Sequence, residues 1–295
     1  MPDTTAYQVR VARLMQDTGK LSCAALSNSC PATAWGPVDY NVLVFGSSST
    51  SNSDTQGAMA IGGALSMSSY SVASKLTADS ARLYVAGSVA FSNGSVGSGS
   101  TGVIRVGGSA AINQSVSRRL LQTGVPTESF TSLKTWYLQL SDKVALLAGV
   151  PAVTDGYGKF TFTGTDLVRN VFTIPGASIA SARQIVFNVP DTATVIVNIT
   201  GTAASFSNGQ NVWGTQSMTD HPRSGQILYN FPQATGITIS SFSPAGTFLA
   251  PRASLAHSNA TLNGQAIVNS FAGSGGFHCG GSFQGSLPAA VAPVQ

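Results

Sequence analysis

The residues able to do chemistry are few and widely scattered in this chain. His278 and Cys279 adjoin in "FHCGG", and a thiol beside an imidazole can act as a nucleophile with its base, but no third group is indicated to orient the histidine. Asp155, Asp166 and Asp191 lack the paired spacing that carboxylates need to cleave glycosidic bonds. The sequence therefore predicts no catalytic residue, and we do not expect an enzyme.

Metal ligands are equally sparse. Asn52 and Asp54 in "SNSDTQG" offer two side-chain oxygens, whereas calcium gathers about six to eight, so we expect these residues to form a structural Asx turn. His221, His257 and His278 lie too far apart to match the spacing of a zinc site. The sequence predicts no metal and no cofactor.

Three cysteines leave an odd thiol. Cys23 and Cys30 are close enough to close a small disulfide loop in an oxidising compartment. Cys279 would then be free, buried, or joined to a partner chain in an intermolecular disulfide. An oxidising compartment also fits four N-x-S/T sequons, which predict N-glycosylation if the host is a eukaryote, at Asn93, Asn113, Asn198 and Asn259.

The composition excludes several partners. Charged residues make up only 9% of the 295 residues, and the formal charge of +4 comes from scattered cations, so no nucleic-acid track is predicted. No apolar run approaches the roughly 20 residues that span a bilayer, which predicts no membrane span. The first residues lack a continuous apolar signal sequence, so a signal peptide either was removed or does not exist.

One basic pair stands out, Arg118 and Arg119 in "SRRLLQ". It is a candidate site for a subtilisin-like processing protease. The alternative is a connector between two elements, with the arginines in water and the leucines in the core.

Small residues dominate the early part of the chain in a repeating pattern. "AIGGALSMSSYSV", "YVAGSVAFSNGSV" and "RVGGSAAINQSV" superpose from positions 60, 84 and 105, which lie 24 and then 21 residues apart. A recurrence near twenty residues with alternating apolar positions is typical of a β-solenoid. Gly62 and Gly63 are predicted where the backbone bends or approaches the neighbouring coil closely.

An amphipathic helix is predicted at about 127–148, after Pro126 and with Thr127 as a candidate N-cap. Apolar residues recur there at spacings of three and four, namely Phe130, Leu133, Tyr137, Leu140, Val144 and Leu147. Gly149 and Pro151 indicate its end. We expect this helix to lie along one face of the solenoid and cover it.

Strand patterns resume after the helix in "KFTFTG", "QIVFNV" and "TVIVNITG", and later segments such as "ILYNFPQATGITI" and "GQAIVNSFAG" recur at about coil length. These patterns predict a second block of coils beyond the helix. The predicted fold class is mainly β, a discontinuous right-handed β-solenoid with one long flanking helix. The predicted organisation is an N-terminal extension or cap at 1–37, the solenoid domain at 38–284 and an extended arm at 285–295.

Several motifs resemble the choice-of-anchor A family of surface proteins over roughly residues 38 to 284. "YNVLVFG" and "SNSDTQGAMAIGG" resemble its opening signature, and "GTFLAP", "LNGQAIVNSF" and "GGFH" its closing one. The chain has Gln56, Gly57 and Ala58 where the family often shows an acidic residue and an arginine. The resemblance implies an extracellular, cell-wall or appendage protein with a β-helical plan like that of ice-binding domains.

Together these features predict an extracellular structural or adhesive protein at the cell surface. The first hypothesis is a subunit of a surface layer, wall or filamentous appendage that associates with itself or with other surface proteins through its termini. The alternative is a monomeric module that binds glycan or ice. Ice binding needs a regular array of Thr or Ser, of which "TFTGT" and "TITISS" show only short runs. Trp35, Trp213 and Tyr229 could stack on sugars or pack in the core.

Overall fold

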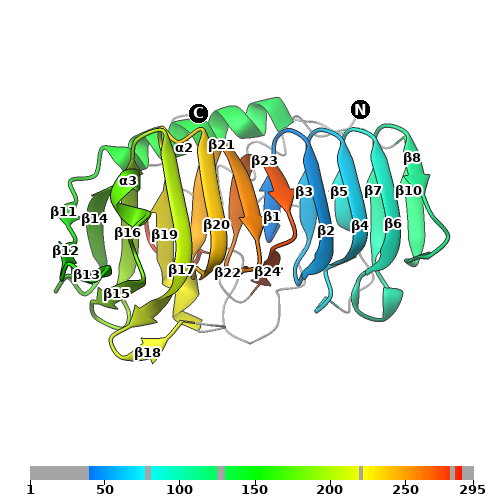
Figure 1. The fold of residues 1–295 in the computed structure, drawn as a ribbon. Coiled ribbons are helices and arrows are strands. Elements are labelled where there is room, and N and C mark those ends of the chain that lie inside the picture. The colour runs from blue at the N-terminus through cyan, green and yellow to red at the C-terminus, as the bar shows by residue number, and fades with distance from the viewer. Residues whose placement is uncertain (1–39, 77–80, 125–129, 219–221, 280–282, 288–295) are drawn as a thin grey trace.

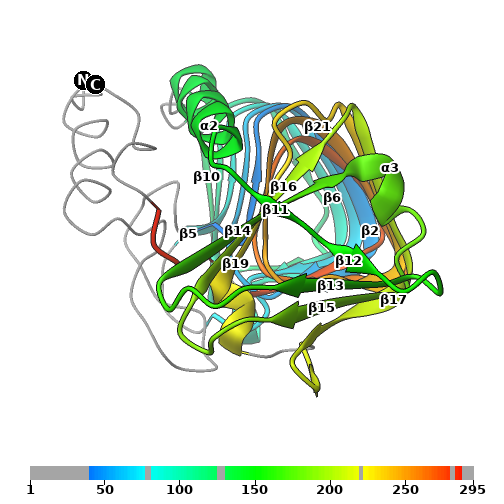
Figure 2. The same cartoon turned by 90° about the vertical axis from the view of Figure 1, so that its left-hand side faces the viewer.

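The alternating apolar segments form parallel strands that stack into a β-solenoid in the computed structural model (Figure 1). The structure describes residues 40–76, 81–124, 130–218, 222–279 and 283–287. Each complete coil has three sides, here called ladders A, B and C, and Figure 2 shows the three-sided outline from one end. The predicted mainly β, discontinuous solenoid with one long flanking helix is confirmed.

Ladder A is parallel throughout. We call its two ends the β10 end and the β11 end. From the β10 end its strands are β10 (Leu120–Thr123), β7 (Val103–Val106), β5 (Ala81–Val85), β3 (Met59–Ile61), β1 (Val42–Val44), the first parts of β23 (Ala266–Gly273) and β21 (Thr247–Ser258), β19 (Ile227–Asn230), β16 (Thr194–Thr200), β14 (Arg169–Pro175) and β11 (Val150–Pro151).

Ladder B lies on the side of the solenoid that faces the viewer in Figure 1. Its strands, in the same direction, are β8 (Ala110–Ile112), β6 (Val89–Val96), β4 (Leu65–Val72), β2 (Ser48–Thr55), the second parts of β23 and β21, β20 (Gly236–Ser243) and β17 (Ala203–Trp213).

Ladder C uses the far ends of β6, β4, β2, β20 and β17 together with shorter strands. These are β9 (Val116–Ser117), β24 (Gly276–His278), β22 (Thr261–Asn263), β15 (Gln184–Asn188) and β13 (Lys159–Thr163). Two short strands turn back antiparallel, β12 (Val153–Thr154) on β13 and β18 (Gln216–Ser217) on β17. In the described segments the helices are α2 (Phe130–Ala145) and α3 (Gly176–Ile179), with 3-10 turns η2 (Ser98–Ser100) and η3 (Pro222–Gln226).

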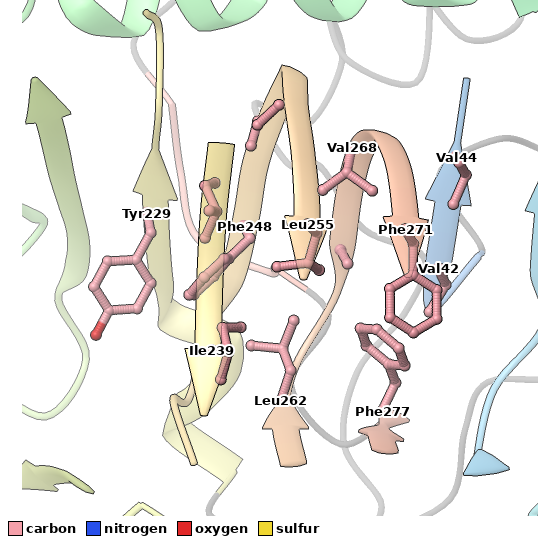
Figure 3. Close-up of a cluster of buried hydrophobic side chains, with 14 of the residues drawn as sticks. Val42, Val44, Tyr229, Ile239, Phe248, Leu255, Leu262, Val268, Phe271 and Phe277 are labelled. Atoms are coloured by element: carbon pink, nitrogen blue, oxygen red, sulfur yellow. The ribbon is translucent and has the colours of Figure 1, made fainter. Parts of the chain in front are cut away.

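The order of the coils along the solenoid differs from their order along the chain. β1 pairs with β3 on one side and with β23 on the other, so the first and last coils of the domain meet in the middle (Figures 1 and 3). From that junction, here called the seam, the chain runs out to the β10 end. It then crosses the outside of ladder A as α2 and returns from the β11 end. The predicted second block of coils beyond the helix is therefore present.

The repeat read from the sequence matches the strand register. Ala60 pairs with Tyr84, and Tyr84 pairs with Arg105, which are the positions at which the three sequence segments superpose. The residues on either side of Ala60, Met59 and Ile61, are fully buried. Like residues stack on like in adjacent coils because inward positions must fill one continuous core.

The core between the ladders is apolar and rich in aromatic rings, and Figure 3 shows side chains from successive coils pointing into it. Phe206 lies at the centre of one aromatic group, with its ring centroid 5.2 Å from that of Phe248 and 5.9 Å from that of Tyr229. Trp213 and Tyr229 are buried in this core, so neither is available to stack on a sugar. Trp35 lies outside the described residues.

The long helix covers the outer side of ladder A, as predicted. α2 buries Tyr137, Leu140 and Val144 against outward residues of the ladder such as Leu43 and Leu228. At about 1.5 Å per residue its 16 residues span about 24 Å, the width of about five strands at about 4.8 Å each. The predicted start of the helix falls in residues 125–129, outside the described residues, and the helix ends at Ala145 rather than 148.

A buried polar network ties the helix to the ladder. Asn230 Nδ2 donates to the Ser141 carbonyl and to Asn198 Oδ1, and both hydrogen bonds are 2.9 Å long. Asn230 Oδ1 accepts a hydrogen bond of 2.6 Å from Ser141 Oγ. Asn198 donates in turn to the Val144 carbonyl at 3.1 Å. These hydrogen bonds join the C-terminal part of α2 to two strands of ladder A.

Replacing Asn230 with alanine is expected to lower the free energy of unfolding by about 2 kcal/mol, because Ser141 and Asn198 would be left buried with missing partners. Chemical denaturation of the two proteins measures this difference. Asn188→Ala, at an exposed position on β15, is the matched control and should change stability by less than about 0.5 kcal/mol. Equal losses in both variants would contradict the role given to the network.

Candidate functional site

The outward side of ladder B is a regular array of small, uncharged side chains, here called the serine face. Its central row runs across eight neighbouring strands, and each residue lies in register with the next. The row consists of Ser205, Thr238, Ala256, Ala272, Ser49, Ser66, Ala90 and Ala111. The residues between the rows point inward and are largely buried, so the strands hold this row toward solvent.

Two further rows flank the central one. The row nearer ladder C consists entirely of serine, in two stretches that β23 interrupts, with Ser207, Ser240 and Ser258 on one side and Ser51, Ser68 and Ser92 on the other. In the row nearer ladder A, Ser270 donates from Oγ to Ser254 Oγ at 2.8 Å, and Ser109 donates to Ser88 at 3.0 Å. Hydroxyls of successive coils thus align along the solenoid axis.

The spacing of this array follows from the geometry of the strands. Neighbouring strands lie about 4.8 Å apart, and outward residues on one strand lie about 6.6 Å apart. Hydroxyl groups both donate and accept hydrogen bonds, whereas the alanine methyl groups do neither. An array of this kind cannot do acid–base chemistry, but it can match an ordered surface that presents hydrogen-bonding groups at regular intervals.

A shallow groove crosses the serine face at the seam. Residues of four strands line it, Ser47–Ser49, Gly236–Thr238, Ser254–Ala256 and Ser270–Ala272. The groove forms because the side chains on these neighbouring coils are small and do not extend far from the strands. It therefore belongs to the serine face rather than being a separate pocket.

The predicted turn residues lie at the corner between ladders B and C. The backbone φ angle of Asn52 is 56°. The equivalent residues on the next two coils, Ser69 and Asn93, have similar φ angles of 49° and 51°. The Asp54 carboxylate accepts a hydrogen bond of 2.7 Å from Ser74 Oγ. Within the described residues, no three His, Cys, Asp or Glu side chains are grouped as metal ligands would be.

The two predicted glycines lie at the corner between ladders A and B. A Cβ atom added to Gly62 would collide with the Phe45 carbonyl and lie 2.7 Å from the Phe130 ring. At Gly63 it would lie 2.7 Å from the carbonyl carbon of Gly46 on the adjacent coil. Larger residues would push the coils apart here, so the serine face depends on these glycines for its close strand stacking.

The residues considered for catalysis are not brought together. Asp155 and Asp166 each accept two backbone N–H groups of their own loops, and these hydrogen bonds lower the pKa of both carboxyl groups. Asp191 instead pairs with Arg223, its Oδ2 lying 2.6 Å from a guanidinium nitrogen. The three carboxylates thus have separate structural roles.

Cys279 directly follows β24 and is buried, which is one of the alternatives expected for it. Cys23 and Cys30 lie outside the described residues, so the disulfide expected between them stays a prediction. The backbone N–H of Cys279 donates to Gln56 Oε1 at 3.4 Å, so the last coil is tied to the first across the seam.

The sequons differ in exposure. Asn93 and Asn259 are exposed at the corner beside the serine face, and Asn113 is exposed on the coil at the β10 end. Asn198 is buried, and its Nδ2 donates to the Val144 carbonyl beneath α2. The prediction of a glycan on Asn198 is therefore wrong, because the amide that would carry the sugar is enclosed.

Arg118 and Arg119 lie in the connection from β9 to β10. The Arg118 guanidinium donates a hydrogen bond of 2.9 Å to the Val116 carbonyl, and Arg119 is exposed. Leu120 is also exposed, whereas Leu121 packs against the core. The connector interpretation holds for the exposed Arg119 and for Leu121 but is wrong for Leu120, and processing at this pair stays a prediction.

Sequence reasoning missed the serine face itself. Its signal is present as serines at alternate positions, as in "SSSTS" from Ser47, but the rows appear only when the strands are in register. In the described part of the chain, no helix combines the length and apolar character needed to span a membrane.

Comparison with known proteins gives one family match. Residues 38–279 match the model of a family described as "Putative Ice-binding-like adhesive domain". This model is not that of the choice-of-anchor A family. The match therefore supports the expected ice-binding-like plan but does not support membership in the choice-of-anchor A family. No curated protein matches the chain.

Three solved structures are similar over most of the chain. An ice-binding protein from an Antarctic biological consortium shares 13% identity, with a TM-score of 0.38, over 86% of this chain and 93% of its own. One from the Antarctic ascomycete Antarctomyces psychrotrophicus shares 13%, with a TM-score of 0.33, over 84% and 95%. One from an Antarctic Flavobacteriaceae bacterium shares 11%, with a TM-score of 0.29, over 84% and 77%. Likenesses this distant carry no argument about function.

Proposed function

Because this chain belongs to the ice-binding-like adhesive domain family, we propose that it is an adhesive module that works outside the cell and binds its target through the serine face. The observation that carries the proposal is the array of neutral hydroxyl and methyl groups in register over eight strands. None of the residues in its three rows carries a charge.

The chemistry of the serine face favours an ordered, hydroxyl-bearing target. The hydroxyl groups of its rows both donate and accept hydrogen bonds, so they fit a target surface whose own groups also do both. The crystal surface of ice and the surface of a packed polysaccharide both have this character. A nucleic acid or an acidic surface would instead require cations, which the face lacks.

Binding to solid targets tests this proposal and separates the two sources of hydroxyl groups. The protein is offered to slowly growing polycrystalline ice and, in separate tubes, to suspensions of cellulose and of chitin, next to a globular control protein of similar mass. We expect enrichment above the control on ice or on one polysaccharide. No enrichment on any of the three would contradict the proposal.

The finer hypotheses drawn from the sequence stay proposals beside this one. Membership in the choice-of-anchor A family depends on the motifs at both ends of the domain, which the structure brings together at the seam: "YNVLVFG" contributes β1, and "LNGQAIVNSF" contributes β23. A role as a subunit of a surface layer, wall or filament would require association between copies. Electron microscopy of the protein from its native source would reveal filaments or sheets if that role holds.

A further inference from the structure

Large exposed apolar side chains are concentrated on one terminal coil of the solenoid. Among the described residues seven such side chains are exposed, and six of them lie between residues 146 and 168, at the β11 end. These six are between 59% and 88% exposed and are Leu146, Val150, Val153, Tyr157, Leu167 and Val168. We call this surface the apolar end, and it faces the viewer in Figure 2.

A solenoid normally ends in a coil whose outer side is polar, because no further coil covers it. The apolar end departs from that rule, while among the described residues of the β10 end one large apolar side chain is exposed, Leu120 at 45%. The difference between the two ends indicates that the apolar end is covered in the assembled protein.

The strand edges at the apolar end are unsuited to adding another strand. Pro151 in β11 has no backbone N–H to donate, and β12 turns back antiparallel onto β13, where Val153 pairs with Thr161. Whatever covers this surface therefore contacts side chains rather than extending the ladders.

The apolar side chains are held outward by ordered loops. Asp155 Oδ1 accepts the backbone N–H of Tyr157 at 2.9 Å, and Asp166 Oδ1 accepts that of Val168 at 2.7 Å. Both loops are fixed in conformations that present these side chains to solvent. A fixed apolar surface loses little conformational freedom when it binds.

We propose that the apolar end binds the apolar end of a second copy of this chain, so that two solenoids join end to end about a two-fold axis. In that arrangement each exposed apolar side chain meets the same kind of surface on the partner. A head-to-tail contact would instead place them against the β10 end, whose described residues include Arg118 and Arg119 and just one large exposed apolar side chain, Leu120.

The charges around the apolar end are also self-complementary. Asp155 and Asp166 lie on its loops, and Lys159 and Arg169 are the first residues of β13 and β14, so the surface carries both signs. A two-fold axis can bring the acidic residues of one copy to the basic residues of the other. The result is a closed dimer rather than an open filament, and it holds whatever the serine face binds.

Sedimentation velocity on the full 295-residue chain tests the proposal at concentrations from about 1 to 100 μM. We expect a monomer–dimer equilibrium. Val153→Lys and Tyr157→Lys should each weaken dimerisation at least tenfold, and because both side chains are exposed, the fold should survive, which thermal unfolding checks. Leu120→Lys, the matched control at the β10 end, should leave the dimer unchanged.

Other outcomes would overturn the proposal. The unmodified chain could remain monomeric throughout, which would mean that something other than a second copy covers the apolar end. Species larger than a dimer would indicate a head-to-tail contact, as would a loss of association in Leu120→Lys comparable to that in Val153→Lys.

Discussion

Replacing Ala272 with tyrosine is expected to lower binding of the protein to its solid target at least tenfold. Ala272 lies in the middle of the central row of the serine face, between Ala256 and Ser49 on the adjacent strands. A tyrosine ring there would stand above the surrounding serines and alanines and hold a flat target away from several strands at once. A tenfold loss corresponds to about 1.4 kcal/mol of binding free energy.

Two further variants separate loss of contact from loss of fold. Ala272→Ser keeps the side chain small and is expected to bind like the original protein. Gln210→Tyr adds the same ring at an exposed position of ladder C and should also leave binding unchanged. Equal binding by Ala272→Tyr and Gln210→Tyr would show that the adhesive surface lies elsewhere on the solenoid.

The fold was largely predictable because a solenoid repeats its packing along the chain. Each coil places an inward residue above the equivalent residue of the last, so the segments from Ala60, Tyr84 and Arg105 carry the register in their spacing. The helix was equally clear, since residues such as Tyr137, Leu140 and Val144 form one apolar stripe at helical spacing.

The candidate site was much harder to predict. Outward residues are not restricted by packing in the core, so no sequence pattern distinguishes them. Ser49 and Ala272 become neighbours only because the first coil pairs with the last. Burial was similarly unpredictable for Asn198, whose sequon looks like the other three although its side chain lies beneath the helix. The apolar end depends on which coil is terminal, which the order of residues does not reveal.

Acidification is expected to destabilise the protein through one buried side chain, His257. It points into the core from β21, in register with Ile239, and its ring centroid lies 5.0 Å from that of Phe277. Burial lowers the pKa of the His257 imidazole from 6.5 to about 4, with only the backbone at Ala260 acting in the opposite direction. The charged form has little solvation in this aromatic environment.

The direction of the effect follows from proton binding. The unfolded chain takes up a proton at His257 as the pH falls below 6.5, whereas the folded chain stays neutral there until about pH 4. Between these values the unfolded state binds more protons, so stability is complete above pH 6.5 and falls as the pH falls. The difference in pKa corresponds to a loss of about 3 kcal/mol by pH 4 and below.

The variant His257→Phe isolates this contribution from that of the carboxyl groups, which also titrate at low pH. Phenylalanine fits the aromatic surroundings formed by Phe271 and Phe277 and cannot take up a proton. Urea denaturation at a series of pH values between about 7 and 4 should show the original protein losing about 3 kcal/mol more than the variant. Parallel curves for the two proteins would mean that the folded chain protonates His257 without cost, and the imidazole would then have to reach water or an acidic partner inside the solenoid.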